Sequence, residues 1–251
     1  KELTFEGRNA VLEAFRSGKT IDKLYILDGC QDGPVKSIVR EAKKTSTIIS
    51  YVEKERLDRL ANTGHHQGVV AIGAAYEYAD VEDILEAARS KGEDPFIFIL
   101  DEIEDPHNLG AIIRTANLAG AHGVIIPKRR AVGLTATVAK TSAGAINYTP
   151  VAKVTNIAAT IESLKKEGLW FVCADMGGET MYNLNLKGPI GLVIGNEGNG
   201  VSRLVKEKCD FVASIPMKGD IDSLNASVAA GVMAFETVSY THLRAHETGR
   251  N

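Results

Sequence analysis

The apolar positions in the first part of the chain predict a mixture of helices and short strands. Helical spacing is found at 10–15 and 35–42, and apolar runs are found at 24–27, 48–52 and 68–75, with a further helix before the last run. Short strands mixed with amphipathic helices are typical of a small two-layer domain. We therefore predict an α/β sandwich domain over 1–76.

From Phe96 onward the strands lose their polar positions. Short, fully apolar segments occur at 96–100, 123–126, 169–174, 190–194 and 211–215, separated by helical stretches. Fully apolar strands that alternate with helices indicate a parallel sheet covered on both faces. We predict an α/β domain of this kind over 96–238, with its ligand site beyond the carboxyl ends of the strands.

Two segments fall outside these domains. Residues 77–95 hold seven acidic and two basic side chains around a short helix at 81–88, and we predict an acidic linker. The apolar pattern ends near Val238, so residues 239–251 are predicted to be a disordered tail that is not native to the protein.

Composition narrows the classes of function. The apolar runs are far shorter than the roughly 20 residues of a membrane span, and the first residues have no signal or transit character, so we expect a cytoplasmic protein without a membrane partner. Cys30, Cys173 and Cys209 are widely spaced, which argues against a disulfide framework and against a metal site. The formal net charge of −3 is concentrated in 77–95, which leaves the flanking domains free to carry basic patches.

A loop that enters a helix follows the strand at 96–100. Within it, Asn108 is predicted to cap the helix, whose apolar positions form a buried stripe. Gly110 and Arg114 are four residues apart and share the opposite face, where the missing side chain of Gly110 leaves space beside the guanidinium. The prediction is an open cationic pocket, and the alternative is that Arg114 is an ordinary solvated residue.

The strand at 190–194 opens into a second loop that contains three glycines and an acid. Gly195, Gly198 and Gly200 permit positive φ and a close approach of the backbone to a flat ligand. Their spacing matches neither G-x-G-x-x-G nor a P-loop, which argues against dinucleotide and triphosphate enzymes. We predict a nucleotide-binding turn, because an ordinary turn would need one glycine and would not call for Glu197.

A third block of small and polar residues runs from Ile215 to Gly231. Ser223 or Ser227 is predicted to cap the final helix, whose first amides would point at a ligand in the loop. Capping and tight packing alone are the simpler explanation, but polar residues are unusually dense for it.

The three blocks resemble the successive signature motifs of the SpoU (TrmH) family of RNA ribose 2′-O-methyltransferases, in the SPOUT superfamily. Asn108, Gly110 and Arg114 match the N-x-G-x-x-R pattern, and 194–200 and 215–229 match the second and third motifs. The wider resemblance is closest to bacterial 23S ribosomal RNA guanosine-2′-O-methyltransferases.

This resemblance implies S-adenosylmethionine-dependent methylation of a ribose 2′-hydroxyl, with a guanosine of large-subunit ribosomal RNA as the substrate. It also implies a carboxyl-terminal trefoil knot, an amino-terminal domain similar to ribosomal protein L30e, and a homodimer with its active site near the interface. The alternatives are a transfer RNA substrate and a non-catalytic RNA-binding member of the fold.

The matching positions imply two groups of site residues. The cofactor-binding group is Gly195, Asn196, Gly198, Gly200, Ile215, Met217, Leu224 and Ser227, and the group at the reacting ribose is Arg114, Asn108, Glu197, Ser223 and Asn225. The family is often described with the arginine as the base, but a guanidinium has a pKa above about 12. We therefore expect Arg114 to clamp a phosphate and to stabilise the developing alkoxide, with Glu197 or water as the proton acceptor.

Further RNA contacts are expected on both domains. The run Lys128, Arg129 and Arg130 lies past the strand at 123–126 and is predicted to contact the RNA backbone, with a solvated charge cluster as the alternative. His66 and Gln67 precede the last strand of the first domain and are expected to contact RNA, with an ordinary histidine-containing turn as the equally good alternative.

Overall fold

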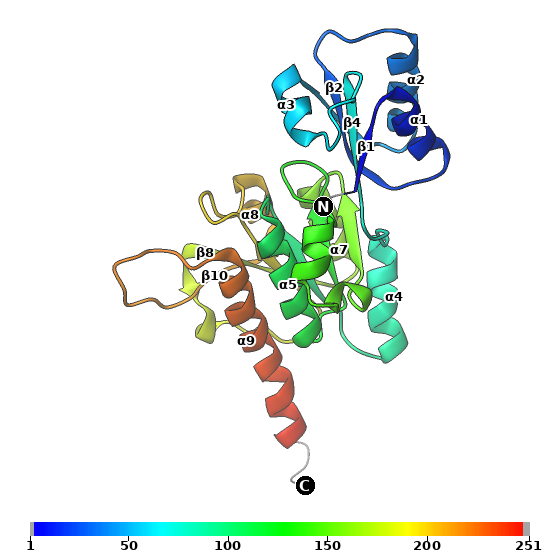
Figure 1. The fold of residues 1–251 in the computed structure, drawn as a ribbon. Coiled ribbons are helices and arrows are strands. Elements are labelled where there is room, and N and C mark those ends of the chain that lie inside the picture. Colours follow the sequence, from blue (N-terminus) through cyan, green and yellow to red (C-terminus); the bar gives the residue numbers. More distant parts are fainter. Residues whose placement is uncertain (1–2, 248–251) are drawn as a thin grey trace. The chain divides into compact units, whose positions relative to one another are not determined.

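The computed structural model describes the backbone of residues 3–247 and the side chains of residues 3–239 (Figure 1). By their internal contacts the residues divide into two compact units, 1–77 with 133–139 and 78–132 with 140–251. Within the described part of the chain, no helix has both the length and the apolar character of a membrane span.

The first unit is a four-stranded sheet with helices packed against it. Its described elements are β1 (Thr4–Glu6), α1 (Arg8–Arg16), β2 (Ile21–Leu27), α2 (Gly33–Lys44), β3 (Ile48–Val52), α3 (Lys54–Leu60) and β4 (Val69–Gly73). The strand order is β1-β4-β2-β3, in which only β2 and β3 are parallel. Helices α1 and α2 bury Val11, Phe15, Val35 and Ile38 in one core with the sheet. The mixed α/β character predicted for this region is confirmed.

Strand β1 is an element that the apolar pattern did not predict. It has three residues, all half-buried, and pairs with β4 from Thr4 opposite Ile72 to Glu6 opposite Val70. Three residues are too few to show a period of two, so only the pairing with β4 identifies this strand.

The second unit is built on a parallel sheet of six described strands. They are β5 (Phe96–Leu100), β6 (Gly123–Pro127), β7 (Val151–Val154), β8 (Trp170–Thr180), β9 (Ile190–Ile194) and β10 (Phe211–Ser214), in the order β10-β8-β9-β5-β6-β7. All neighbouring pairs are parallel, as predicted. The sequence did not predict β7, because this edge strand is short and carries Lys153 among its apolar residues.

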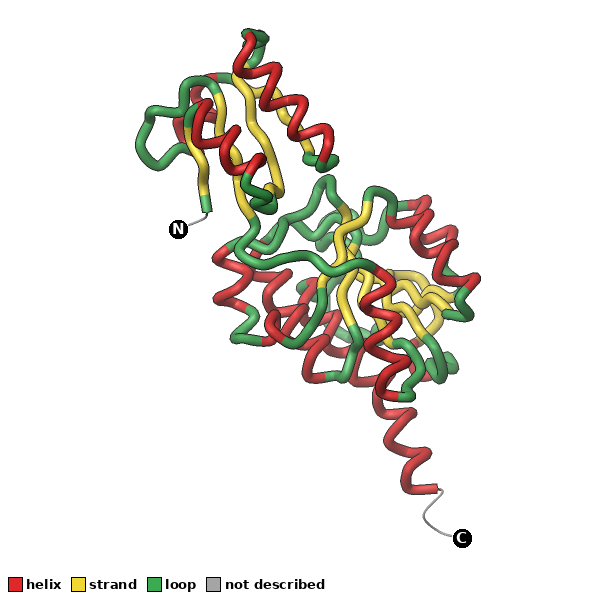
Figure 2. Tube along the Cα trace, turned by 90° about the vertical axis from the view of Figure 1, so that its right-hand side faces the viewer, coloured by secondary structure: helices red, strands yellow, loops and turns green. Residues whose placement is uncertain are grey.

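Helices cover both faces of this sheet (Figure 2). The second unit contributes α4 (Val81–Lys91), α5 (Pro106–Leu118), α7 (Ile157–Lys166), α8 (Arg203–Lys208), α9 (Ala226–Glu247) and the 3-10 turns Ala145–Asn147 and Met181–Asn183; α6 (Ala136–Thr141) spans the division between the units. Apolar side chains of α4, α7 and α8 pack with Ile97, Ile99 and Phe171 in one core. Helices α5 and α9 pack against each other and against β6 and β9. The prediction of a sheet buried on both faces is confirmed.

The predicted acidic linker at 77–95 is largely a helix of the second unit. Ile84 and Leu85 of α4 belong to the core of that unit, and Gly123 on β6 leaves room for Ile84, because a Cβ there would lie 2.5 Å from it. The acids remain on the exposed side, where Glu82 and Glu86 both pair with Arg89. The charge pattern therefore marked the outer face of a packed helix rather than a free connector.

The end of the chain also differs from the prediction of a disordered tail over 239–251. Helix α9 continues through 239–247, and residues 248–251 lie outside the described part of the chain. The segment lacks Gly and Pro until Gly249 and includes Leu243, Ala245 and Glu247, which are good helix formers. The loss of the apolar stripe near Val238 therefore did not end the helix.

Candidate functional site

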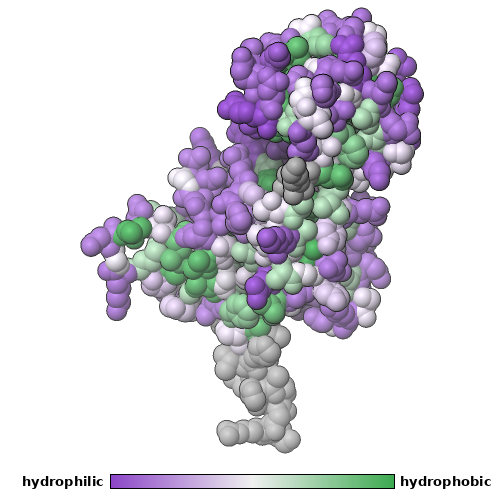
Figure 3. Space-filling model, viewed as in Figure 1, coloured by the Kyte–Doolittle hydropathy of each residue, from purple (hydrophilic) through white to green (hydrophobic). Residues whose placement is uncertain are grey.

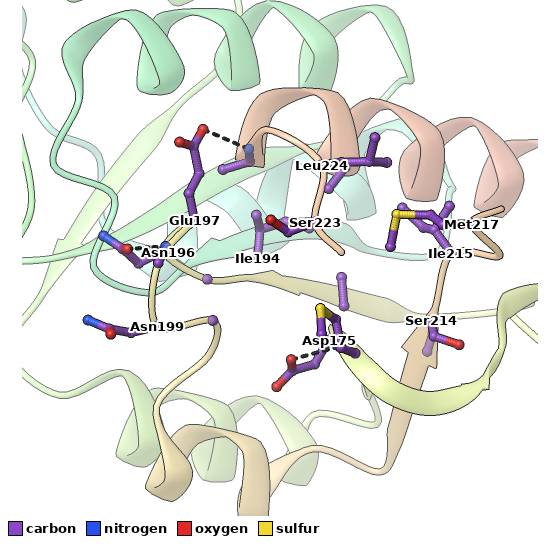
Figure 4. A pocket seen from close by; sticks show the side chains of 18 residues that line it. Asp175, Ile194, Asn196, Glu197, Asn199, Ser214, Ile215, Met217, Ser223 and Leu224 are labelled. Carbon is purple, nitrogen blue, oxygen red and sulfur yellow. Dashed lines mark hydrogen bonds between the residues drawn. The ribbon is translucent and has the colours of Figure 1, made fainter. Parts of the chain in front are cut away.

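A cavity of about 270 Å³ lies at the carboxyl ends of β9 and β10 and beside the middle of β8 (Figure 4). This is where a parallel sheet places its ligand sites. The predicted residues Gly195, Asn196, Glu197, Gly198, Gly200, Ile215, Met217, Ser223 and Leu224 line it. The second and third sequence blocks, which are separated by α8 and β10, therefore meet around one hollow.

The loop after β9 is a tight turn closed by its own backbone. The amide of Asn196 donates to the carbonyl of Gly200 at 3.1 Å, and the amide of Gly200 donates to the carbonyl of Asn196 at 2.7 Å. A Cβ on Gly195 would lie 2.3 Å from the carbonyl oxygen of Gly200, and Gly200 has a φ of 66°. Gly198 meets no such restriction, since a Cβ there would contact only the Asn196 side chain, at 3.4 Å. Two of the three glycines are therefore required by the turn.

The side chain of Glu197 joins the three sequence blocks. Its Oε1 accepts hydrogen bonds from Nδ2 of Asn108 at 3.1 Å, from the amide of Ala226 at 3.0 Å and from Nδ2 of Asn225. Asn225 Nδ2 also donates to Oδ1 of Asn108 at 3.1 Å. A carboxylate, two amides and a helix amide thus form one polar cluster at the rim of the cavity.

Asn225, rather than Ser223 or Ser227, caps the final helix. Its Oδ1 accepts from the backbone amides of Ser227 at 2.9 Å and Val228 at 3.3 Å, as an N-cap residue does. Ser227 turns its hydroxyl to the same oxygen and does not line the cavity. Ser223 is exposed and does line it. One asparagine therefore both begins α9 and presents an amide to Glu197.

The start of α5 also differs from the prediction that Asn108 caps it. The helix begins at Pro106, and Asp105 is the N-cap, with its carboxylate accepting from the amide of His107 at 2.8 Å. Proline suits the first helical position, because it has no amide hydrogen to satisfy and its φ is already helical. Asn108 lies within the first turn, which leaves its side chain free to reach Glu197.

The expected role of Gly110 is wrong. It is buried, and a Cβ there would lie 1.8 Å from Oγ1 of Thr141 and 3.0 Å from the amide of Ser142. The missing side chain allows the segment at 141–142 to pack against α5 and does not open space beside the guanidinium. Arg114 is exposed, and its side chain has no hydrogen bond or ion pair with any residue that the structure describes. Within this chain it is available to a ligand but not in contact with the Glu197 cluster.

Two aspartates take part in the site and were not predicted. Asp175 of β8 lines the cavity and pairs with Lys206 at 3.1 Å. Asp101, buried directly after β5, accepts from the amide of Ser202 at 2.7 Å and so fixes the far end of the β9 loop. Asp101 follows the rule that ligand sites lie at the carboxyl ends of strands, and that rule could have selected it. Asp175 lies within β8, two residues past the last pair of that strand with β9.

The residues predicted to contact RNA differ in exposure and in the contacts that their side chains already make within the protein. Arg129 and Arg130 are exposed beyond β6, and Arg130 pairs with Glu102 at 3.3 Å; Lys128 is half-buried. His66 is 7% exposed, with Nδ1 accepting from the amide of Gly68 at 3.0 Å and Nε2 bonded to Asp58 at 2.8 Å. Both ring nitrogens of His66 are thus bonded within the first unit, one to its own turn and one to α3, which supports the structural alternative.

Gln67 has the same kind of role. It has a φ of 50°, and its side-chain oxygen accepts from the amide of Arg8 at 3.0 Å, while its carbonyl accepts from Nε of Arg8 at 3.2 Å. These bonds hold the turn against the start of α1.

Two family models match the chain. The model of the SpoU rRNA Methylase family matches residues 95–235, and the model for RNA 2′-O ribose methyltransferase substrate binding matches residues 5–79. The two matches fall on the sheet that carries the cavity and on the first unit, respectively.

Individual proteins show the same likeness over nearly the whole chain. YacO of Bacillus subtilis, named as a TrmH family tRNA/rRNA methyltransferase, is 52% identical over 231 residues, which are 92% of each protein. A Staphylococcus haemolyticus protein that is also named as a TrmH family tRNA/rRNA methyltransferase is 47% identical over 252 residues, which are 100% of this chain and 99% of that one. The crystal structure of the SpoU methyltransferase AviRb from Streptomyces viridochromogenes, in complex with AdoMet, is 26% identical with a TM-score of 0.60, over 96% of this chain and 90% of that one.

Proposed function

Because the chain belongs to the SpoU rRNA methylase family, we propose that it transfers the methyl group of S-adenosylmethionine to the 2′-hydroxyl of a ribose in RNA. The observation that carries this proposal is the hydrogen-bonded cluster of Asn108, Glu197 and Asn225 at the rim of the cavity. The cluster places polar groups from three distant segments beside a hollow that a nucleoside can enter.

The cavity residues fit the cofactor. Ile215, Met217 and Leu224 supply apolar walls, and the turn from Gly195 to Gly200 contributes backbone and polar side-chain groups to the lining. Apolar walls with a few placed polar groups are typical of a site for a flat ring carrying polar substituents. When bound, S-adenosylmethionine supplies an electrophilic methyl group on a positively charged sulfur.

The substitution Gly195→Ala tests the cofactor site. We expect it to weaken S-adenosylmethionine binding at least about tenfold, because the added methyl overlaps the Gly200 carbonyl and shifts the turn. Isothermal titration calorimetry measures the affinity, and a thermal melt shows whether the fold is retained. Gly33→Ala, in the first unit where an added Cβ would meet no atom within 4 Å, is the control and is expected to bind as the native chain does. Equal binding by both variants would contradict the proposed position of the cofactor.

The chain's own residues have two tasks at the substrate: to hold the ribose and to receive the 2′-hydroxyl proton. We assign the Glu197 carboxylate as the proton acceptor. One of its oxygens accepts the three N–H hydrogen bonds, and its other oxygen has no hydrogen bond with a described residue. Asn108 and Asn225 orient that carboxylate. Arg114 supplies positive charge for a phosphate and for the developing alkoxide.

The substrate we propose is a guanosine of large-subunit ribosomal RNA. The names of the relatives cover both ribosomal and transfer RNA, and the match over 5–79 supports an RNA-binding role for the first unit. A transfer assay with labelled cofactor on ribosomal RNA fragments and on transfer RNA, with mapping of the modified ribose, tests this choice. Labelling of transfer RNA alone would show that transfer RNA, not ribosomal RNA, is the substrate. Labelling of neither RNA would contradict the proposed reaction.

We also propose a homodimer formed through α9. Val228, Val232 and Phe235 lie four and three residues apart on this helix and are 50%, 36% and 50% exposed, and Leu118 at the end of α5 is 66% exposed. Figure 3 shows apolar side chains gathered over this face of the molecule. An apolar stripe of this kind is typical of an interface. Because α5 packs against α9, such a dimer would also bring Arg114 close to the partner subunit.

The double substitution Val232→Asp, Phe235→Asp tests the interface. We expect the native chain to sediment as a dimer at micromolar concentration and the variant as a monomer, because two charges would have to be buried. Leu204→Asp, at an apolar residue of α8 that is 56% exposed, is the control and should remain dimeric. A monomeric native chain, or a dimeric double variant, would rule out this interface.

Lys128 and Arg129 are proposed to contact the RNA backbone beyond β6. Replacing both with Gln should lower the slope of log Kd against log salt by roughly 1 to 1.5, since each lost phosphate contact removes about 0.7 for a single strand. Binding of a labelled RNA at several salt concentrations measures the slope. Lys166→Gln with Lys187→Gln changes the charge equally at exposed positions elsewhere in the unit and is the control. An unchanged slope in the first variant would make these residues a solvated cluster.

A further inference from the structure

A second hollow, of about 370 Å³, lies in the first unit between helix α2 and strand β3. It is independent of the cavity at β8, β9 and β10. Its lining includes Lys36, Arg40 and Lys43 from the helix, Tyr51 from the strand and Gln31 from the loop before the helix. It holds three cations and no acidic residue.

The cations lie on one face of α2. Lys36, Arg40 and Lys43 are four and three residues apart, so their side chains project on the same side, while Val35, Ile38 and Ala42 are buried on the other. All three residues are exposed, and none of their side chains has a hydrogen bond or an ion pair with a described residue. The burial pattern of the helix therefore directs its unpaired positive charge at the hollow.

The two acids of α2 and its N-cap are already paired with other cations. Asp32 caps α2 through the amide of Val35 and pairs with Arg8, and Glu41 pairs with Lys44 at 2.9 Å. The Lys44 bond lowers the pKa of Glu41, with a weaker contribution from Arg40. Positive charge around the hollow is thus left without an internal partner, which favours an anionic ligand.

Strand β3 supplies the other wall. It is the edge strand of the sheet, and the Tyr51 ring is 53% exposed. Val35 and Val39 add apolar surface, and the Gln31 amide can both donate and accept. These groups match the parts of one nucleotide. The exposed ring and the apolar surface can stack a base, the side-chain amide can recognise its edge, and the row of cations can bind a phosphate.

We propose that this α2–β3 hollow binds a nucleotide in a single-stranded segment of the RNA substrate, away from the ribose that is methylated. The proposal rests on the proposed function, since it concerns the RNA on which that function acts. The base stacks on Tyr51 with its edge toward Gln31, and the adjoining phosphates lie along Lys36, Arg40 and Lys43. The first unit then selects the RNA by an unpaired nucleotide, while the second unit carries out the transfer.

Two variants of the full chain separate the phosphate and base contacts. The triple substitution Lys36→Gln, Arg40→Gln, Lys43→Gln should weaken binding of a labelled single-stranded RNA at least about tenfold and lower the salt slope by about 2. Tyr51→Ala should weaken binding by roughly tenfold and leave the salt slope unchanged, because stacking releases no counterions. Fluorescence anisotropy without cofactor gives both quantities, and all the substitutions are at exposed positions.

The control is the triple substitution Lys19→Gln, Lys54→Gln, Arg59→Gln, which removes the same charge from exposed positions of the same unit. It should bind RNA within threefold of the native chain. If both triple variants lose the same affinity, only net charge matters and the site is overturned; if Tyr51→Ala binds normally, the nucleotide is overturned in favour of a general anion surface, such as one for an acidic peptide.

The outcome is separable from that of the proposed reaction. Methyl transfer by the native chain and its affinity for S-adenosylmethionine test the reaction, whereas the anisotropy data need no cofactor. A native chain that transfers methyl groups while its triple variant binds RNA normally would refute the α2–β3 site alone.

Discussion

Replacing Glu197 with Gln is expected to lower the rate of methyl transfer by about two to three orders of magnitude while S-adenosylmethionine still binds. General bases contribute roughly this much, and glutamine keeps the shape of the side chain but cannot accept a proton at its amide. The oxygen that receives bonds from Asn108, Asn225 and Ala226 can be retained in the variant. Single-turnover transfer on RNA, together with calorimetry of cofactor binding, separates the two effects.

The control for this change is Glu207→Gln, which removes a carboxylate from the surface of α8, where Glu207 pairs with Arg203. It should leave the rate unchanged. If Glu197→Gln keeps a rate within threefold of the native chain, Glu197 only organises the cluster and the proton leaves to water. Glu197→Ala then distinguishes these roles, because it also removes the acceptor of three hydrogen bonds and should impair cofactor binding.

Replacing Arg114 with Ala is expected to reduce transfer by about 100-fold or more, with little change in stability. The side chain is exposed and has no partner among the described residues, so its removal leaves no group unsatisfied within the chain. Arg114→Lys should recover only part of the rate, because lysine keeps the charge but loses the planar fork that binds a phosphate through two bonds. A thermal melt and a transfer assay measure the two quantities.

Arg203→Ala is the matched control, since the Arg203 side chain is 92% exposed on α8. Full activity in Arg114→Lys would show that the two-bond contact of the guanidinium with a phosphate is not needed. Full activity in Arg114→Ala would show that Arg114 is an ordinary solvated surface residue. A loss of stability in Arg114→Ala would point to a structural role that the exposed side chain does not suggest.

Some interpretations failed because local pattern does not specify which partner a residue meets. Asn108 is a residue type that often caps a helix. The helix begins earlier, however, with Asp105 as its N-cap and Pro106 as its first residue. Helical spacing places Gly110 beside Arg114, yet Gly110 packs against Thr141. A helical projection cannot show this contact, because Thr141 belongs to another segment. In each case the residue type indicated a local role, but the sequence did not show which residue it would contact in the folded chain.

The sequence by itself determined the strands and helices that are long enough to show a period, the parallel character of the second sheet, and the polar residues of the three blocks. It did so because burial on one side imposes a period of about 3.6 on helices, and burial on both faces leaves the strands of a parallel sheet fully apolar. Only the tertiary structure decided that Asn108, Glu197 and Asn225, up to 117 residues apart, share hydrogen bonds. Their meeting depends on strand order, which places β5 beside β9 and β8 beside β10, and pairing between distant strands leaves no local trace in the sequence.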